Sequence, residues 1–494
     1  MKEGKTKTFD IFKEWTESMT MHGFPNIFRT KFLAIKIMWI VFFLASTSAC
    51  FFLIISNLIN FFNFDVVTKI RVIEKDSVLF PAVTICNINP FVTKQGLEYV
   101  QSILEESNLT SFTQATLDPT FQDEFSKLNF NYNIFKYFLT TFSKSISIEQ
   151  KKKLSLSFDK MFISCLHNLR PCNESQWTWF YNSDFGNCYR FNSDQNSQEI
   201  QKTYQAGKYI GLMIELYVGI PEDQKTLSRT TGAHVYIDDN SMQPLIGQGV
   251  DVAPGFETNL VLQRIQRKQM PKPYSSCIEN LDSIDSFDSE YYRKVFRSNL
   301  TYRQDDCFFS YIQSEIYKKC KCYEMASNII PGNNNPCDNF VKQNCALLEF
   351  QRLTQSSYKK SVESLCPLEC ESITYGVTKS ASRYPSVSYG NDLVKTKQIK
   401  ALFGNRTNIS IEELRENILS LNIYYEYLKQ TEITENRSIS WDGLVGSIGG
   451  TLGLFLGISF LTFAEIIDLL LQIVFFKFKK NTSKVFFIKK ELEF

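Results

Sequence analysis

The chain has 494 residues, of which 44% are hydrophobic and 14% aromatic, and its formal net charge at pH 7 is +2. This composition excludes an intrinsically disordered protein, and the near-neutral charge argues against a nucleic-acid partner. The sequence has no Pro-rich, Gly/Ser-rich or repeated segment of the kind that links independent domains.

The first 36 residues are basic, with seven Lys or Arg against four acidic residues. They contain no short apolar core followed by a small-residue cleavage site, so they differ from a secretory signal peptide. The dipeptide His22-Gly23 lies within them and by itself indicates no chemistry. We expect residues 1–36 to form a cytoplasmic N-terminal segment, because basic flanks of spanning helices stay inside the cell.

An uncharged stretch follows, from Ile37 to Phe64. It is longer than the roughly 20 residues that cross a bilayer as a helix, and Trp39 stands near its start, where indole rings favour the interface. The sequence therefore predicts a first transmembrane helix at residues 37–62. Residues 477–494 are again basic and are expected to form a cytoplasmic tail. With both termini inside the cell, residues 63–442 lie outside it.

Twelve of the 13 cysteines lie in residues 63–442, and the other, Cys50, falls in the first predicted span. An even number suits disulfide bonds in an oxidising compartment, but the spacing leaves their pairing open. Zinc is the weaker interpretation, because the cysteines lack paired C-x2-C spacing, and we predict no metal site. Glycosylation sequons in the same region are Asn108, Asn173, Asn299, Asn405, Asn408 and Asn436.

Residues 63–442 are predicted to form a cysteine-rich α+β domain. Apolar or alternating runs predict strands at residues 78–86, 208–220, 232–238 and 258–266. Residues 279–296 and 305–320 are predicted to be helices. We expect a single large antiparallel core with helices at its edge.

A second span is predicted at residues 443–476. No residue between Asp442 and Glu465 is charged, and Glu465 and Asp468 lie inside the same apolar run. A carboxylate at the bilayer centre costs roughly 2.5–3.5 kcal/mol or more, so such acids normally face water, a partner or an ion path. The alternative is a position near the interface from which the acids reach water. At about 100° per residue, Glu465, Asp468 and Gln472 share one helix face.

Glycines recur in the first half of this span, and Gly446, Gly450, Gly453 and Gly457 fall on one stripe. Close helix packing is one explanation, and a pore-lining face in an oligomer is the other. We predict these pore-lining residues: Ser447, Gly450, Gly453, Glu465 and Asp468.

A pore helix of this sequence requires a break. On a straight helix Ser459 would lie about 120° from Glu465, so both could not face one axis. Gly457 makes a break least costly at this point. Gly457, Ile458 and Ser459 are therefore predicted to form a short non-helical ring that narrows the pore, which is tolerated at membrane depth where it lines water or protein.

The stretch GGTLGLFLGISFLTFAEIID at residues 449–468 closely resembles the second span of the degenerin/epithelial sodium channel/acid-sensing ion channel superfamily. The resemblance implies that Gly457, Ile458 and Ser459 form the ion-selectivity filter, although the middle residue is usually small in that family. It also implies pore acids at Glu465 and Asp468, and a gating role for His22 and Gly23, which match a His-Gly pair before the first span.

Further motifs extend the resemblance over nearly the whole chain: FPAVTICNINPF at residues 80–91, GNCYRFN at 186–192, APGFETN at 253–259 and CPLECESITYGVTKSASRYPS at 366–386. The resemblance implies a hand-shaped ectodomain in a homotrimer or heterotrimer. It also implies six disulfides: Cys86–Cys188, Cys165–Cys172, Cys277–Cys370, Cys307–Cys366, Cys320–Cys345 and Cys322–Cys337.

The implied function is a sodium-selective, amiloride-sensitive cation channel of the plasma membrane, opened by an extracellular signal. Proton sensing near neutral pH usually relies on histidine, and only His167 and His234 lie in the predicted extracellular region, residues 63–442. A ligand such as a neuropeptide is therefore favoured over protons, as in an invertebrate ligand- or peptide-gated member. Tyr274 is expected to pack near Phe62 and Phe64 and to couple the ectodomain to the pore.

Two other classes of membrane protein share parts of this sequence pattern. A trimeric ATP-gated-type channel shares the two-span plan but would need a lysine-rich nucleotide site and a different second span. A two-span receptor or adhesion glycoprotein without a pore would have no use for Glu465 and Asp468 in lipid. No phosphate loop, nucleophile elbow or HExxH motif indicates an enzyme, and no cofactor is expected beyond transported sodium. The expected partners are further subunits, membrane lipid and an unidentified extracellular ligand.

Overall fold

The computed structural model describes residues 13–106, 146–182, 184–194, 199–219, 230–244, 248–298, 300–323, 335, 337 and 340–491. The chain forms two compact units, one made of Met1–Val67 and Glu435–Phe494 and the other of Thr68–Thr434. The sequons at Asn108 and Asn299 lie outside the described residues.

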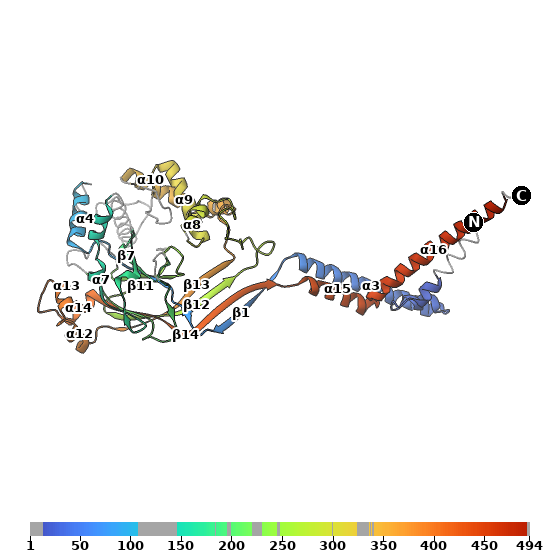
Figure 1. Cartoon of the computed structure of the whole chain (residues 1–494), viewed down its shortest axis with the longest axis horizontal. Helices are drawn as coiled ribbons and strands as arrows, with labels where there is room; N and C mark the ends of the chain where they lie inside the picture. Colours follow the sequence, from blue (N-terminus) through green and yellow to red (C-terminus); the bar gives the residue numbers. More distant parts are fainter. Residues whose placement is uncertain are drawn as a thin grey trace. The chain divides into compact units, whose positions relative to one another are not determined.

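The larger unit is built on a seven-stranded sheet, drawn with its neighbouring elements in Figure 1. The strand order is β13 (Glu371–Arg383), β12 (Phe256–Lys268), β14 (Ile418–Arg437), β9 (Leu212–Tyr217), β4 (Phe162–His167) and β5 (Arg170–Pro171), and β1 (Val66–Glu74) also pairs with β14. The pair β12–β14 is parallel, whereas β12–β13 and β14–β9 are antiparallel. The sheet is therefore mixed, and the prediction of a purely antiparallel core is wrong.

A second sheet of five antiparallel strands shares the core of the first. Its order is β11 (Val250–Val252), β10 (Ala233–Asp238), β3 (Ala82–Asn87), β7 (Gly186–Phe191) and β6 (Trp177–Asn182), and β2 (Val78–Leu79) pairs separately with β8 (Lys202–Thr203). One cluster of buried side chains joins Ile85 and Phe191 of this sheet to Ile214 and Leu421 of the other. Every residue of β3 and β7 is buried, because these central strands are covered on both faces. The strands predicted at residues 208–220, 232–238 and 258–266 are confirmed as β9, β10 and β12, whereas residues 78–86 form two strands, β2 and β3, that belong to different sheets.

Helices surround the two sheets (Figure 1). They are α4 (Lys94–Glu106), α6 (Ile148–Leu154), α7 (Phe158–Met161), η3 (Glu174–Gln176), α8 (Glu290–Arg297), α9 (Gln304–Cys320), α10 (Phe340–Leu353), α11 (Ser356–Val362), α12 (Val387–Leu393), α13 (Lys397–Leu402) and α14 (Ile411–Asn417). The helix predicted at 305–320 is confirmed as α9. The helix predicted at 279–296 is wrong before Ser289, whose hydroxyl accepts the backbone N–H of Tyr292 and caps α8.

Six disulfides cross-link the larger unit, and they join the same pairs of cysteines that the family resemblance implies. They are Cys86–Cys188, Cys165–Cys172, Cys277–Cys370, Cys307–Cys366, Cys320–Cys345 and Cys322–Cys337. The first joins directly paired positions of β3 and β7, and the second closes the hairpin between β4 and β5. The other four hold the helices α9, α10 and α11 and the segments beside them. Cys50 is the free cysteine.

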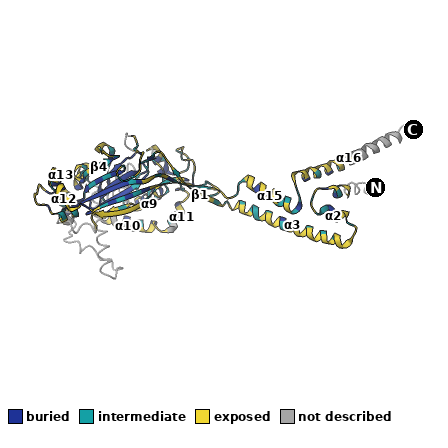
Figure 2. Cartoon of the chain, turned by 90° about the horizontal axis from the view of Figure 1, so that it is seen from below, coloured by how far each residue is buried: buried dark blue, intermediate teal, exposed yellow. Residues whose placement is uncertain are grey.

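The described residues of the smaller unit include the helices α2 (Phe24–Arg29), α3 (Leu33–Phe62), α15 (Trp441–Leu456) and α16 (Phe460–Glu491), and residues 13–18 are also helical. Helix α3 has 30 residues, about 45 Å at 1.5 Å per residue, which exceeds the hydrocarbon thickness of roughly 30 Å. Its apolar side chains are mostly exposed in the single chain (Figure 2). Helix α15 packs along α3, where the Ser46 hydroxyl donates to the Phe455 carbonyl at 2.6 Å.

Within the described part of the chain, α3 is the helix that is long and apolar enough to cross a membrane by itself. Helix α15 and residues 460–475 of α16 satisfy the same criterion only when taken together as one broken span. Helix α3 begins four residues before the predicted span, and α16 continues past residue 476 to Glu491.

Candidate functional site at the broken C-terminal helix

The helix break predicted from sequence lies between α15 and α16. Helix α15 ends at Leu456, α16 begins at Phe460, and the two helices are bent by 71°. Gly457 has φ +67°, and the N–H groups of Gly457 and Ile458 donate to the carbonyls of Gly453 (3.0 Å) and Leu452 (3.3 Å). This is the usual glycine termination of a helix in the left-handed region. The predicted non-helical step at residues 457–459 is confirmed.

On the other side of the break, hydrogen bonds between Ser459 and Thr462 stabilise the first turn of α16. The Ser459 N–H donates to the Thr462 hydroxyl at 3.1 Å, and the Thr462 N–H donates to the Ser459 carbonyl at 3.0 Å. Thr462 is buried, whereas the Ser459 side chain is exposed. The break is thus a hydrogen-bonded structure with one small hydroxyl side chain left on its surface.

The N-terminal segment lies directly against this break. The His22 N–H donates to the Leu456 carbonyl at 2.9 Å. The His22 ring occupies the space where a side chain at Gly457 would start, since an added Cβ would lie 2.2 Å from its Nδ1 atom. Gly23 has φ +79°, begins α2 and lies against the Trp39 ring. Sequence reasoning placed both residues in the cytoplasmic segment but gave no signal of this contact.

The carboxylate of Glu465 is held by the same segment. Its Oε2 atom accepts the Thr20 N–H at 3.1 Å and the Thr20 hydroxyl at 3.2 Å, and its backbone carbonyl accepts the Trp15 indole N–H at 2.9 Å. Hydrogen bonds to a charged acceptor are stronger than neutral ones, commonly about 1.5–3 kcal/mol each. The structure therefore couples the position of residues 15–22 to the first acid after the break, through partners that the sequence did not reveal.

Asp468 lies one turn further along and is exposed. Its Oδ2 atom accepts the Gln472 amide N–H at 2.8 Å, so these two side chains share a helix face as predicted. The described residues contain no group of three or more His, Cys, Asp or Glu side chains that could hold a metal ion.

The glycines of α15 do not mediate packing within the single chain. A Cβ added at Gly446, Gly449 or Gly450 would meet no atom within 4 Å, and Ser447 is exposed beside them. Helix α15 instead faces α3 with a different set of residues, including Thr451, whose carbonyl lies 3.9 Å from the Cys50 sulfur. The stripe is therefore an open surface at Gly446 and Gly450, where packing between α3 and α15 does not explain it, whereas Gly453 is half-buried and Gly457 lies against His22.

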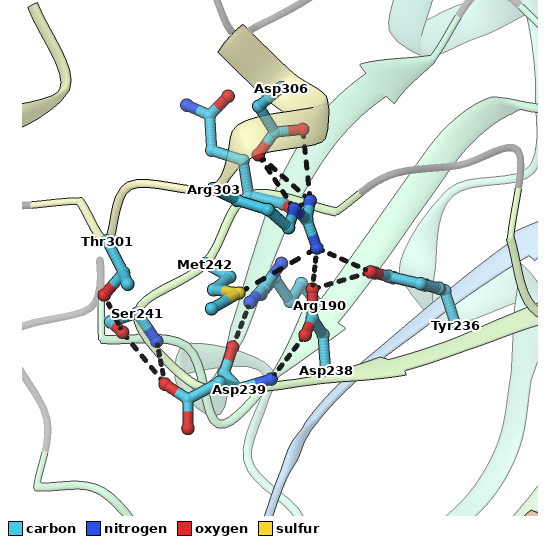
Figure 3. A network of polar contacts seen from close by, with 10 residues as sticks. Arg190, Tyr236, Asp238, Asp239, Ser241, Met242, Thr301, Arg303 and Asp306 are labelled. Carbon is cyan, nitrogen blue, oxygen red and sulfur yellow. Dashed lines mark hydrogen bonds and ion pairs between the residues drawn. The ribbon is translucent and has the colours of Figure 1, made fainter. Parts of the chain in front are cut away.

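The larger unit contains a buried ion-pair network between β10 and the start of α9 (Figure 3). Arg303 donates to Asp238 Oδ2 at 3.0 Å and to both carboxylate oxygens of Asp306 at 3.1 and 3.2 Å. The Tyr236 hydroxyl also donates to Asp238, at 2.6 Å. Burial raises the pKa of Asp306 to about 6, against the opposing attraction of Arg303. Sequence reasoning missed this cluster.

The two ectodomain histidines are packed among other side chains. His167 lies between Phe80 and Phe191, with ring centroids at 4.8 and 5.1 Å, and burial lowers its pKa to about 4. The Nδ1 atom of His234 lies 2.7 Å from Asp251 Oδ1, and its ring stacks on Phe185 at 4.5 Å. Both rings are fixed by neighbours, in agreement with structural roles.

The remaining predicted residues are placed as follows. Tyr274 lies in a turn where its N–H donates to the Pro271 carbonyl at 3.1 Å, and its packing near Phe62 and Phe64 stays a prediction. The described sequon asparagines are all exposed: Asn173, Asn405, Asn408 and Asn436. Their side chains are therefore accessible to glycosylation.

Comparison with known proteins defines the family. The chain matches the amiloride-sensitive sodium channel family over residues 15–469 and belongs to that family. It is 27% identical to acid-sensing ion channel 1C of Danio rerio over 479 residues, which cover 93% of this chain and 83% of that protein. It is 24% identical to the bile acid-sensitive ion channel of Mus musculus over 475 residues, 94% of this chain and 87% of that protein.

A third relative has a similar likeness: acid-sensing ion channel 2 of Rattus norvegicus is 26% identical over 475 residues, 93% of this chain and 86% of that protein. The family consists of ion channels of the plasma membrane. The chain is accordingly an ion channel of the sodium channel family and not an enzyme.

Proposed function

We propose that the chain is one subunit of a sodium-selective, amiloride-sensitive cation channel. The observation that carries this proposal is the break at residues 457–459, followed within the same apolar segment by Glu465 and Asp468. In this proposal residues 37–62 and 443–476 cross the membrane, residues 63–442 are extracellular, and both termini are cytoplasmic. The family match and the open glycine face of α15 support this arrangement.

The proposed pore is formed by three copies or by related subunits. Gly457, Ile458 and Ser459 form its narrowest ring, and the helix face with the exposed Ser447 and Gly450 and the half-buried Gly453 lines the ion path above that ring. Rings of carboxylates attract cations, so three copies of Glu465 and Asp468 supply a negative field below the break. Water in the pore removes the cost of placing these acids in lipid.

The proposed opening signal is an extracellular ligand such as a short peptide. The support is that both described ectodomain histidines are packed, and that burial lowers the pKa of His167 far below neutrality. Protons are a second candidate, favoured by the pKa of Asp306 near 6 and by relatives that are named acid-sensing. The two signals are separated by Asp306→Asn, which abolishes acid-evoked current if protons act through the Arg303 network and leaves ligand-evoked current intact.

The experiment that tests the function is whole-cell recording in a heterologous cell, with sodium and potassium baths exchanged and amiloride added. A sodium-favouring current that amiloride blocks supports the proposal. Potassium and sodium currents of equal size contradict the selectivity, and insensitivity to amiloride contradicts the pharmacology. If ATP alone opens the channel, the ATP-gated alternative is correct. The alternative of a two-span receptor without a pore makes a different prediction. It is correct if the wild type and the variants Glu465→Gln and Asp468→Asn all reach the cell surface and bind ligand but none of them conducts current.

A further inference from the structure

A pocket of about 590 Å³ lies in the larger unit beside the β4–β5 hairpin. One wall is the hairpin turn with His167, Asn168 and Arg170, and the facing wall includes residues 199–205 with strand β8. The volume lies within the range of about 300–1,000 Å³ that small-molecule sites occupy. Its position differs from the break at residues 457–459.

Both walls of the pocket are fixed by the fold. The disulfide Cys165–Cys172 closes the hairpin, and the turn residues Asn168 and Leu169 have φ angles of +51° and +61°. On the facing wall, the Gln201 N–H donates to Asn192 Oδ1 at 2.7 Å, and the Gln201 carbonyl accepts the Phe80 N–H at 3.0 Å. A site with braced walls loses little entropy when a ligand binds.

The charged side chains that line the pocket indicate the charge of the ligand that it would bind. Arg170, Lys202 and Glu199 line it, all three are exposed, and none forms an ion pair with another described residue. With His167 uncharged at neutral pH, the lining has one excess positive charge. Arginine and lysine bind carboxylates through charge-assisted hydrogen bonds, so an acidic group on the ligand matches this wall.

The rest of the lining suits amide groups and one apolar side chain. Gln201 and Gln205 offer both donors and acceptors, as a peptide backbone requires. Ile200, Tyr204 and Ile210 provide the apolar part. The lining thus combines an anion-binding pair, amide side chains and an apolar patch.

We propose that this pocket binds a short extracellular peptide that carries a carboxylate. Arg170 and Lys202 hold the carboxylate, and Gln201 and Gln205 bond to the peptide backbone. The proposal deepens the ligand-gated function proposed above and rests on it for the consequence of binding, but not for binding itself.

Binding is therefore measured apart from current. The full-length channel in detergent is incubated with a mixture of tripeptides of sequence X-Glu-X with free carboxyl ends, and retained peptides are quantified by mass spectrometry. The comparison mixture is X-Gln-X with amidated ends, which keeps the size and removes the carboxylates. We expect at least tenfold greater retention of the acidic mixture.

Variants assign the retained peptides to the pocket. Arg170→Ala combined with Lys202→Ala should lower retention at least tenfold, whereas Lys397→Ala, which removes an exposed cation on α13, should leave it unchanged.

Equal retention of both mixtures, or retention that survives the double variant, would overturn the proposal. Displacement of the peptides by inorganic phosphate at equal concentration would show a simple anion site and would overturn the peptide assignment. Retention in the pocket without any evoked current would uphold the site and contradict the proposed ligand gating. A peptide-evoked current that persists in the double variant would place the gating ligand elsewhere and would overturn the role of this pocket.

Discussion

Gly457 is the position at which one added methyl group perturbs the break most directly. Its φ of +67° lies in the left-handed region, where a residue with a Cβ costs roughly 1–2 kcal/mol. The added Cβ would also lie 2.2, 2.5 and 2.8 Å from the Nδ1, Cγ and Cε1 atoms of His22. These distances are far below van der Waals contact, so Gly457→Ala must displace the His22 ring, the break or both.

In one of the two channel states, closed or open, residues 15–22 contact the break as described above. If the substitution changes the free-energy difference between the two states by 1–2 kcal/mol, the open probability changes about 5- to 30-fold. Patch-clamp recording of Gly457→Ala measures this change together with the sodium-to-potassium permeability ratio. Gly449→Ala is the matched control, because its Cβ would meet no atom within 4 Å and alanine is favoured inside a helix.

The double variant His22→Ala/Gly457→Ala separates the clash from the backbone strain. Removing the ring relieves the clash, so the double variant should be milder than the sum of the single variants, with a coupling energy of about 0.5–3 kcal/mol. Additive effects, or a Gly457→Ala channel indistinguishable from Gly449→Ala, would refute the inference that His22 and Gly457 share one space in the working channel.

Three further predictions concern other residues. Ser459→Trp should abolish or reshape sodium permeation, seen in the reversal potential, and unchanged permeation would remove the filter assignment. Glu465→Gln should reduce single-channel conductance, whereas Thr20→Val, which leaves the carboxylate charged but removes a hydroxyl donor, should alter the open probability; the opposite pattern would contradict the coupling described above. The pKa of His167 is lowered from its ordinary 6.5 to about 4, so the stability it contributes is present above pH 6.5 and lost as the pH falls through 4. The full loss is about 3 kcal/mol. Melting temperatures of the wild type and His167→Phe between pH 7 and 4 should diverge for this reason, and parallel curves would disprove it.

The features predicted correctly from sequence depend on local pattern. The break could be predicted from Gly457 and from the fact that Ser459 and Glu465 cannot face the same axis on a straight helix. The strands could be predicted from short apolar runs. The helix predicted over residues 279–289 failed because Ser283 forms a turn that competes with helix: its hydroxyl accepts the Asp285 N–H at 3.4 Å, and its carbonyl accepts the Ser286 N–H at 3.1 Å.

The features missed depend on contacts between distant parts of the chain. No local signal places His22 against Leu456 or Thr20 against Glu465. The parallel pairing of β12 with β14 likewise joins segments whose order along the chain gives no hint of direction. The disulfide pairs came from the family resemblance, since the cysteine spacing left them open.

Four carbonyl oxygens near the end of α15 are already engaged. Those of Leu452 and Gly453 accept N–H groups from the break itself, that of Phe455 accepts the Ser46 hydroxyl, and that of Leu456 accepts the His22 N–H. A helix end normally leaves such oxygens open to water or ions. In the proposed pore, a cation that loses its hydration water at Leu456 would therefore compete with the His22 N–H for the Leu456 carbonyl oxygen. Ion passage and the binding of the N-terminal segment to the break would then be linked through this one backbone atom.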